Sequence, residues 1–267
     1  MRDNSVVTSY TRFIAFGDSI TEGLCDDRID GQYIGWADRV AQVLATQSED
    51  FTYFNAAVRG KRLEQVIADQ IPLGMPYIEG ANTLVSFHAG ANNILRPGYD
   101  PSVILPMYQS AARALAATGA QLMLFTVQEV AEPRTRTQHL WNARFSGFNA
   151  MVRSTARELG ALLLDGNAYE VFFDRRLIAS DRLHLNDQGH RRVAAAVLAN
   201  LGLPHDADWA EPMPPASRVR AASRVASTMV WIWQFLLPWM LRRLTGKSSG
   251  DGRVAKHTAP IALSNKR

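Results

Sequence analysis

The sequence contains one cysteine, Cys25, among its 267 residues, which excludes an internal disulfide framework. No Cys or His spacing resembles a zinc site and no Gly-rich phosphate loop occurs, so no metal or other cofactor is expected. The sequence also lacks an uninterrupted apolar run of about 20 residues, which argues against an ordinary membrane-spanning helix. Residues 1–11 are polar and mixed, without the apolar stretch of a secretory signal, so a cytoplasmic protein is expected.

Acidic residues are nearly absent from the last part of the chain. Residues 218–267 hold ten Lys and Arg and one acid, Asp251, whereas residues 1–217 hold 19 basic and 24 acidic residues. The net charge of +4 therefore combines a mildly acidic body with a strongly basic tail. Such tails are typical of solvated arms and of segments that contact nucleic acid or an anionic surface. No nucleic-acid partner is predicted here.

Short apolar segments alternate with segments of helical periodicity along residues 12–200. This alternation predicts an α/β fold with a parallel sheet covered on both faces. No Gly-x-Ser-x-Gly sequence occurs, which disfavours the larger α/β-hydrolase fold. A polar loop over 128–138 is expected to border a substrate cleft. The predicted strands are 12–16, 51–56, 83–89, 121–127 and 161–165, and the predicted helices are 36–44, 63–70 (stopped by Pro72), 101–117, 141–159 and 186–200.

The most informative segment is Phe16-Gly17-Asp18-Ser19, which follows the first predicted strand. Gly17 breaks the strand, and Asp18 is expected to hydrogen-bond the backbone of the turn. Ser19 is thereby placed at the carboxyl end of an inner strand, where open α/β sheets carry their chemistry. A plain structural turn is the alternative interpretation of this segment alone.

A second segment, Asp181-Arg182-Leu183-His184, offers the groups that a serine nucleophile needs. A serine hydroxyl requires an adjacent base, and a histidine base requires a carboxylate that holds its tautomer. Two intervening residues leave Asp181 close enough to reach the imidazole of His184. The alternative is that His184 merely begins a surface helix.

Two further loops contain groups that could stabilise an oxyanion. Asn92 follows the strand 83–89, and its amide could donate a hydrogen bond, although an ordinary Asx turn is the alternative. Gly60 follows the strand 51–56 and could offer an unobstructed backbone N–H or simply permit a tight turn.

Ser19, Gly60, Asn92 and His184, in this order, resemble the four blocks of the SGNH, or GDSL-type, esterase and lipase family. The resemblance covers roughly residues 10–202. It implies a flavodoxin-like three-layer α/β/α sandwich with a five-stranded parallel sheet. It also implies that Ser19 attacks an ester carbonyl, that His184 takes its proton, and that Asp181 orients His184. The oxyanion hole would be formed by the backbone N–H groups of Ser19 and Gly60 and the side chain of Asn92.

One position departs from the family pattern. The third block usually reads Gly-x-Asn-Asp, and this chain has Asn93 at the last position. The donor Asn92 is retained, so we expect the chemistry to survive with altered hydrogen bonding in the loop. Any salt bridge that the usual Asp makes there is absent.

We therefore predict a serine hydrolase that cleaves a small-molecule carboxylic ester through an acyl-enzyme, without metal or cofactor. Acyl transfer to an alcohol other than water is the nearest alternative, because the same acyl-enzyme serves both reactions. A catalytically weak, membrane-associated binding protein on this scaffold is a second alternative, motivated by Asn93 and the basic tail. A thiol role for Cys25, which closely follows Ser19, is a minor alternative.

The chain is divided into four parts by these patterns. Residues 1–202 form the catalytic domain, 203–217 a Pro-rich linker, 218–245 a basic aromatic helical extension, and 246–267 a tail expected to be disordered. The extension is predicted to pack on the body or on a second copy of the chain, with contact to a membrane surface as the alternative. Its aromatic residues are Trp231, Trp233, Phe235 and Trp239.

Overall fold

The structure, a computed structural model, describes residues 9–215, 227–245 and 247–263. Its main sheet contains six strands in the order β7-β6-β5-β1-β4-β8. All neighbouring strands are parallel except β8, which is antiparallel to β4. The strands are β1 (Arg12–Gly17), β4 (Thr52–Asn55), β5 (Thr83–His88), β6 (Gln121–Phe125), β7 (Leu162–Leu164) and β8 (Ile261–Ala262).

The predicted five-stranded parallel sheet is thus confirmed, and the C-terminal segment adds a sixth strand that was not predicted. Numbered along the chain, the parallel strands lie in the order 2-1-3-4-5, which is the flavodoxin-like order. In this topology the strand order reverses between β1 and β5, and ligands bind outside the carboxyl ends of the strands at that point. A separate antiparallel pair, β2 (Arg28–Ile29) and β3 (Gln32–Tyr33), follows α1 (Ser19–Glu22).

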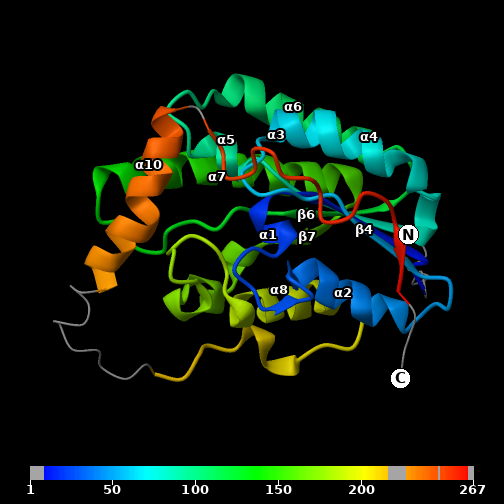
Figure 1. Ribbon diagram of the computed structural model, residues 1–267. Coiled ribbons are helices and arrows are strands. Elements are labelled where there is room, and N and C mark those ends of the chain that lie inside the picture. Colours follow the sequence, from blue (N-terminus) through cyan, green and yellow to red (C-terminus); the bar gives the residue numbers. More distant parts are fainter. Residues whose placement is uncertain (1–8, 216–226, 246, 264–267) are drawn as a thin grey trace.

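Helices cover both faces of the sheet and give the molecule three layers (Figure 1). On one face α2 (Trp36–Ala45) packs against α8 (Asp187–Asn200), and on the other α6 (Pro101–Ala116) packs against α7 (Arg136–Leu159). The predicted capping residue Asn186 accepts a hydrogen bond from the backbone N–H of Gly189 and so begins α8. The short helices are α3 (Leu63–Gln65), α4 (Ile71–Gly74) and α5 (Ala91–Ile94).

Successive residues of β1 enter the two halves of the core. Phe13 and Ala15 belong to the apolar cluster that contains α2 and α8, whereas Ile14 and Phe16 belong to the cluster that contains α6 and α7. This alternation follows from the two-residue period of a strand. A central strand covered on both faces is therefore apolar throughout, as the sequence of β1 is.

Two helix boundaries differ from the sequence prediction. The helix expected at 141–159 begins at Arg136, because Thr135 and Gln138 form a reciprocal capping box that extends it into the expected polar loop. The helix expected to stop at Pro72 instead continues through a π-helical turn into α4. Pro72 lies in the first turn of α4, directly after the π-helical turn Val66–Gln70.

The helical extension lies at one end of the molecule beside α7 (Figure 1). Its described part runs from residue 227 through a π-helical turn into α10 (Leu237–Leu244). Residues 218–226, which were predicted to belong to it, lie outside the described residues. No helix among the described residues is both long and apolar enough to cross a membrane.

The extension contacts the enzyme body through Trp231. The Trp231 indole N–H donates to the backbone oxygen of Asp181 at 2.8 Å, and the Arg182 guanidinium lies 4.8 Å from the centre of the indole ring. Trp233, in contrast, is 68% exposed. Packing on the body is therefore present in the structure, and contact of the exposed side with a second copy or a membrane stays a prediction.

In place of the expected disordered tail, residues 247–263 form an extended segment across the body (Figure 1). We call this the C-terminal strap. Its strand β8 continues the sheet, and the backbone N–H of His257 donates to the Asn55 carbonyl at 3.0 Å. The Lys256 ammonium lies 2.7 Å from the Asp38 carboxylate and is almost completely buried. Edge pairing and a buried ion pair hold this polar segment in place, although it has no apolar periodicity.

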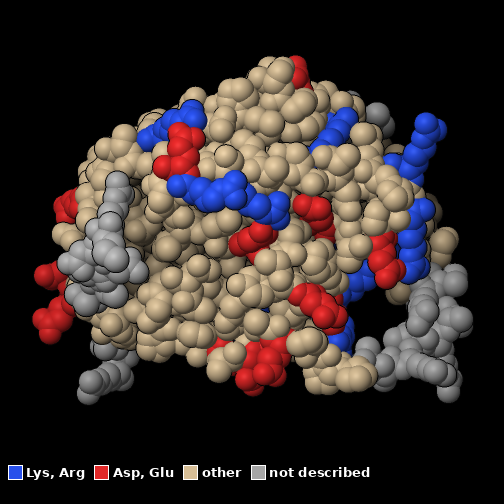
Figure 2. Space-filling view, turned by 180° about the vertical axis from the view of Figure 1, so that it is seen from behind, with Lys and Arg blue, Asp and Glu red and all other residues tan. Residues whose placement is uncertain are grey.

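The Pro-rich linker, described as far as residue 215, also lies on the body. Trp209 packs against Tyr169 and Phe172, and the Arg192 guanidinium donates to the carbonyl oxygens of Asp208, Trp209 and Glu211. On the reverse side of the molecule, basic and acidic side chains lie next to one another rather than in a field of one sign (Figure 2). Among its described residues, that face therefore presents no continuous basic patch.

Candidate functional site

Three predicted site residues follow the carboxyl ends of three adjacent central strands. Ser19 follows β1, Gly60 follows β4 and Asn92 follows β5, and these strands are neighbours in the order β5-β1-β4. The carboxyl ends of parallel strands meet at one edge, so the three loops share the edge at which the strand order reverses. The sheet topology thus brings together the residues of three sequence blocks.

Ser19 is the first residue of α1 and lies directly after its capping residue, Asp18. The Asp18 carboxylate accepts a hydrogen bond from the Ile20 backbone N–H at 3.5 Å, as predicted for this turn. Ser19 is 8% exposed, and neither its hydroxyl nor its backbone N–H has a hydrogen-bond partner among the described residues. Both groups are therefore free to engage a substrate.

Asp181 and His184 are brought together as their spacing predicted. The His184 Nδ1 lies 2.5 Å from one Asp181 carboxylate oxygen, and the other oxygen accepts the backbone N–H groups of Leu183 and His184 at 3.0 Å. Arg182 adopts a left-handed φ of 59° in this turn. Burial opposes ionisation of Asp181, but the His184 hydrogen bond and charge, together with the two N–H groups, lower its pKa to about 2. An ionised Asp181 leaves the Nε2 atom of His184 as its available nitrogen.

Contacts from other elements place this pair near Ser19. The charge of His184 lowers the pKa of Asp18, which immediately precedes Ser19. His190, one turn into α8, approaches the Leu24 carbonyl with its Nε2 at 3.2 Å, while its Nδ1 accepts the Trp36 backbone N–H. Burial lowers the pKa of His190 to about 4, so a neutral ring connects α8 to the loop after α1.

Asn92 makes two hydrogen bonds through its amide nitrogen. One goes to the Asp18 carboxylate and the other to the Lys61 carbonyl, each at 3.0 Å. Burial raises the pKa of Asp18 to about 6, against the lowering effects of the Ile20 N–H, of His184 and of Asn92. The amide therefore lies in the site but is already engaged with protein acceptors.

The loop that carries Gly60 is held by a residue that the sequence reasoning missed, Glu22. Its carboxylate accepts the Arg59 backbone N–H at 2.6 Å and forms an ion pair with the Arg59 guanidinium. Gly60 itself has a left-handed φ of 73°, which favours glycine, and its N–H has no partner among the described residues. The signal was the acidic residue three positions after Ser19, but nothing in the sequence indicated its partner.

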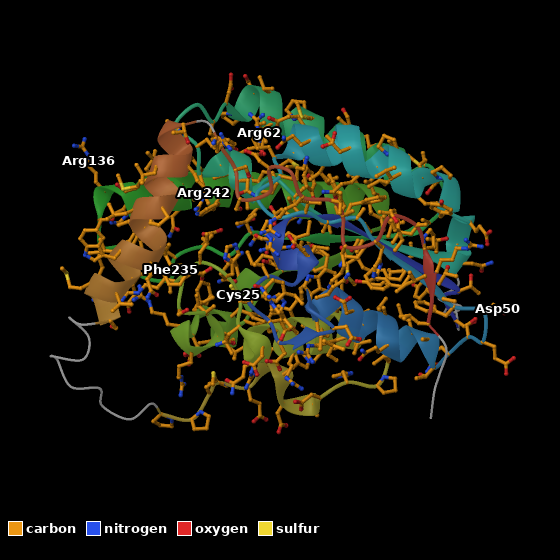
Figure 3. All side chains as sticks on the ribbon, in the orientation of Figure 1. Cys25, Asp50, Arg62, Arg136, Phe235 and Arg242 are labelled. Carbon is orange, nitrogen blue, oxygen red and sulfur yellow. The ribbon has the colours of Figure 1, made fainter. Side chains whose placement is uncertain are left out.

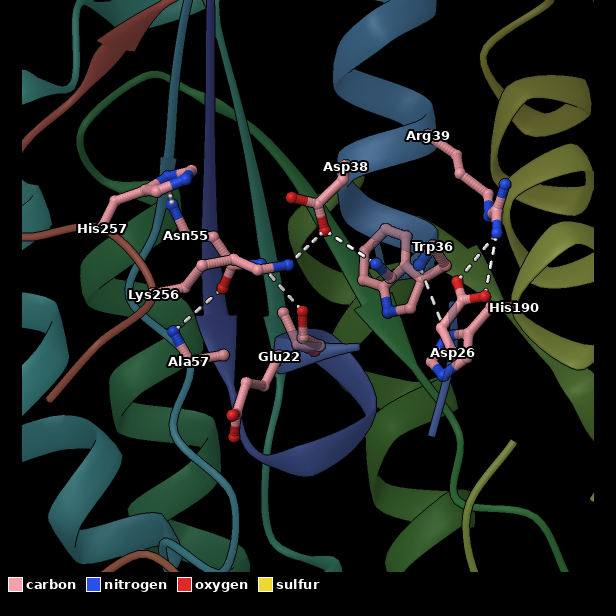
Figure 4. A network of polar contacts seen from close by, with 12 residues as sticks. Glu22, Asp26, Trp36, Asp38, Arg39, Asn55, Ala57, His190, Lys256 and His257 are labelled. Atoms are coloured by element: carbon pink, nitrogen blue, oxygen red, sulfur yellow. Dashed lines mark hydrogen bonds and ion pairs between the residues drawn. The ribbon is translucent and has the colours of Figure 1, made fainter. Parts of the chain in front are cut away.

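Further buried side chains fix the same loops. The Gln70 amide exchanges two hydrogen bonds with the backbone of Gly17, at 2.9 and 2.8 Å. The fully buried Asn55 donates to the Thr21 carbonyl and accepts the Ala57 N–H (Figure 4). The strap joins this network, because the Asn55 backbone N–H donates to the His257 ring at 3.1 Å.

Asn93, at the position that departs from the family pattern, forms hydrogen bonds through both the oxygen and the nitrogen of its side chain. Its side-chain oxygen accepts the Leu63 N–H and its amide donates to Glu64, each at 2.8 Å. An aspartate here would place a second carboxylate against Glu64. The amide of Asn93 can donate a hydrogen bond to the Glu64 carboxylate, which an ionised aspartate at this position could not do.

Cys25 lies beside the Asp181–His184 pair. Its sulfur is 3.6 Å from the Asp181 carboxylate, and Cys25 adopts a left-handed φ of 73°. Burial and the Asp181 charge raise the pKa of the Cys25 thiol to about 12, so it remains a thiol rather than a nucleophilic thiolate. Donor atoms of Cys25, Asp181 and His184 lie within 4.8 Å of one another, but a metal there would compete with the Asp181–His184 hydrogen bond.

Comparison with known proteins places this geometry in a family. The sequence profile of the GDSL-like Lipase/Acylhydrolase family matches residues 15–192. A search among curated proteins found no match. Among solved structures, the acetylxylan esterase Axe2 of Geobacillus stearothermophilus is 16% identical, with a TM-score of 0.61 over 78% of this chain and 100% of that chain.

Two other solved structures show the same fold. The psychrotrophic esterase EstA of Pseudoalteromonas sp. is 16% identical, with a TM-score of 0.54 over 72% of this chain and 97% of that chain. LAE5, an alpha/beta hydrolase enzyme from the metagenome of Lake Arreo, is 22% identical, with a TM-score of 0.55 over 73% of this chain and 96% of that chain. Since the family profile covers well over half of the sequence, the chain belongs to the GDSL-like lipase/acylhydrolase family and is a hydrolase of the esterase and lipase type.

Proposed function

We propose that this protein hydrolyses carboxylic esters through an acyl-enzyme formed on Ser19. The Ser19 hydroxyl attacks the ester carbonyl while His184 Nε2 takes its proton, and the carbonyl electrons move to the oxygen. The tetrahedral intermediate collapses to an acyl-serine, and His184 returns the proton to the departing alcohol. Water, activated by the same His184, then releases the acid and restores Ser19.

The observation that carries this proposal is the 2.5 Å contact between His184 Nδ1 and Asp181. This contact fixes the tautomer in which Nε2 can accept a proton, and the ionised Asp181 favours the imidazolium that forms during attack. His184 and Ser19 form no hydrogen bond in the structure; catalytic hydrogen bonds often tighten only when substrate is bound.

The oxyanion would be stabilised by the N–H groups of Ser19 and Gly60, which have no partner among the described residues. Asn92 would supply a third donor. Because both N–H bonds of Asn92 are engaged, one of its hydrogen bonds, to Asp18 or to the Lys61 carbonyl, would be shared with the oxyanion. A donor of this kind is worth about 10²–10³ in turnover in other hydrolases.

Solved relatives support this assignment of chemistry. In Axe2, alanine variants of a serine and of a histidine are catalytic mutants. EstA has been crystallised in a form inhibited by monoethylphosphonate. A neutral fluorophosphonate is therefore a suitable probe for the nucleophile of this chain.

The test is labelling by that probe together with hydrolysis of a short chromogenic ester. We expect one label per chain, located on Ser19 by peptide mapping, and loss of both label and turnover in Ser19→Ala. Ser154→Ala, which alters an exposed serine on α7, is the matched control and should retain both. Turnover that survives Ser19→Ala, or a label on Cys25, would contradict the proposal.

A further inference from the structure

A small cavity opens beside the proposed oxyanion donors and is built from two distant parts of the chain. Its volume is about 50 Å³. Gly60, Asn92 and Arg96 line it from the body, and the extension and strap complete it. The residues from that second part are Arg242, Lys247, Ser248 and Ser249. Figure 3 shows Arg242 on the side of the extension that faces the body.

The charge of this cavity is entirely positive. Its lining contains Arg96, Arg242 and Lys247 and no carboxylate, and none of the three forms an ion pair with a described residue. The Nε atom of Arg96 is buried and has no hydrogen-bond partner within the part of the chain that the structure describes. A buried donor without an acceptor is costly, so a ligand that accepts a hydrogen bond from it would be stabilised there.

Neighbouring cations behave differently. Arg59 pairs with Glu22, Lys61 with Asp69, Arg62 with Glu64, and Lys256 with Asp38. These four cations near the site are therefore paired with protein acids, whereas the three that line the cavity are paired with none that the structure describes. Three cations without an acid partner among the described residues thus line one cavity, next to Gly60 and Asn92.

The strap is seated firmly enough to form a wall of this cavity. The Ser248 hydroxyl donates to the Gly60 carbonyl at 3.1 Å and accepts the Gly250 N–H at 3.3 Å. A Cβ atom at Gly250 would lie 2.0 Å from the Arg59 carbonyl oxygen, so only glycine allows this close approach. The contact fixes the strap against the loop that carries the oxyanion donor.

We propose that this cavity binds an anionic group, a carboxylate or a phosphate, that the ester substrate carries beyond its scissile carbonyl. The inference rests on the proposed ester hydrolysis. Guanidinium groups bind carboxylate and phosphate oxygens through paired N–H donors, and Lys247 adds a point charge. The cavity volume of about 50 Å³ accommodates a group of a few non-hydrogen atoms. Arg96, Arg242 and Lys247 are thus specificity-determining residues for an anionic ester.

The anionic group can belong to the acyl part or to the alcohol part, so the test uses one matched ester pair for each. The acyl pair is the mono-para-nitrophenyl ester of adipic acid and its methyl ester, which is neutral and of similar length. The alcohol pair is para-acetoxybenzoate and its methyl ester. Rates are corrected for spontaneous hydrolysis. We expect kcat/KM for the anionic member of at least one pair to exceed that of its neutral partner by roughly tenfold or more at low salt.

Substitutions then locate the origin of this preference. In Arg96→Gln and in Arg242→Gln, the ratio of anionic to neutral kcat/KM should fall about three- to tenfold, and in the double variant it should approach one. Arg242→Gln alters a residue of the extension, so it tests the cavity even if Arg96→Gln fails to fold. Arg136→Gln is the matched control: it removes the same charge from an exposed position pointing away from the body (Figure 3) and should leave the ratio unchanged.

The failure of this inference can be separated from the failure of the proposed function. If Ser19 is labelled and neutral esters are cleaved, but neither pair shows a preference for its anionic member, the inference is wrong and the proposed function stands. A ratio that falls as much in Arg136→Gln as in Arg96→Gln would also overturn it. If no ester is cleaved and Ser19 is not labelled, the proposed function fails and takes the inference with it.

Discussion

The carboxyl group of Asp18, between the backbone of α1 and the amide of Asn92, provides a sharp test of the site's electrostatics. Asp18 is 4% exposed, and burial raises its pKa to about 6 despite the Ile20 N–H, the charge of His184 and the Asn92 amide. An aspartate in the unfolded chain has a pKa near 3.9. Between these values the folded protein binds the proton more tightly than the unfolded chain, so the Asp18 contribution to stability falls as the pH rises from about 4 to 6.

The size of this effect follows from the shift. A shift of about two pKa units corresponds to about 3 kcal/mol of stability, which is fully present below pH 4 and fully lost above pH 6. About 2 kcal/mol of it falls between pH 4.5 and pH 8. Asp18→Asn removes the ionisation but leaves an amide hydrogen that faces the donors of Ile20 or Asn92. That hydrogen-bond cost is the same at both pH values, so it cancels when the two are compared.

The assay is urea unfolding of wild type and Asp18→Asn at pH 4.5 and pH 8. We expect the variant to gain about 2 kcal/mol relative to wild type on going to the higher pH. Asp100→Asn, at the exposed cap of α6, controls for replacing a capping aspartate. A stability difference that does not change with pH, or one in which wild type gains as the pH rises, would refute the reasoning. Turnover should fall in Asp18→Asn, because a negative charge that favours the His184 imidazolium is removed.

Three further predictions concern neighbouring parts of the molecule. Asn92→Ala should lower kcat by roughly 10²–10³ with a smaller change in KM in steady-state ester hydrolysis, because the oxyanion exists only in the transition state; a change confined to KM would contradict its role. Asn93→Asp should lower the free energy of unfolding by about 1–2 kcal/mol, since it places a carboxylate against Glu64, and Glu64→Gln in the same chain should restore it. Truncation after Pro215 should lower the midpoint of thermal unfolding, because it deletes β8 and the strap; an unchanged midpoint would show that the strap does not stabilise the domain.

The sheet and the core of the site could be predicted because both depend on local patterns. The strands are short apolar runs that end at glycine or polar residues, and Asp181 and His184 are close in sequence. Parallel strands place their carboxyl ends at one edge of the sheet. The proximity of Ser19, Gly60 and Asn92 can therefore be predicted without knowing any long-range side-chain contact. Each of these inferences requires only the periodicity of a segment or the topology that follows from alternation.

The supporting contacts could not be predicted, because each depends on a pairing between distant residues. Glu22 meets Arg59 and Asn93 meets Glu64 only once the loops have been placed by the sheet. The strap shows the same limitation. Its composition is polar and Gly-rich, which indicates disorder, and the pairings that order it, such as Lys256 with Asp38, span most of the chain. The composition of a segment indicates how much apolar surface it can bury by itself. It does not indicate which strand edge or which charged residue elsewhere in the chain the segment will pair with.

The family profile ends at residue 192, and this boundary separates two parts of the site. The groups proposed for bond cleavage all lie within it, whereas Arg242 and Lys247 lie well beyond it. Since both parts line one cavity, the segment outside the family profile contributes to the lining of the site, although it carries none of the groups proposed for bond cleavage. Family membership therefore accounts for the reaction class, and specificity in this chain is to be sought where the extension and strap meet the Gly60 loop.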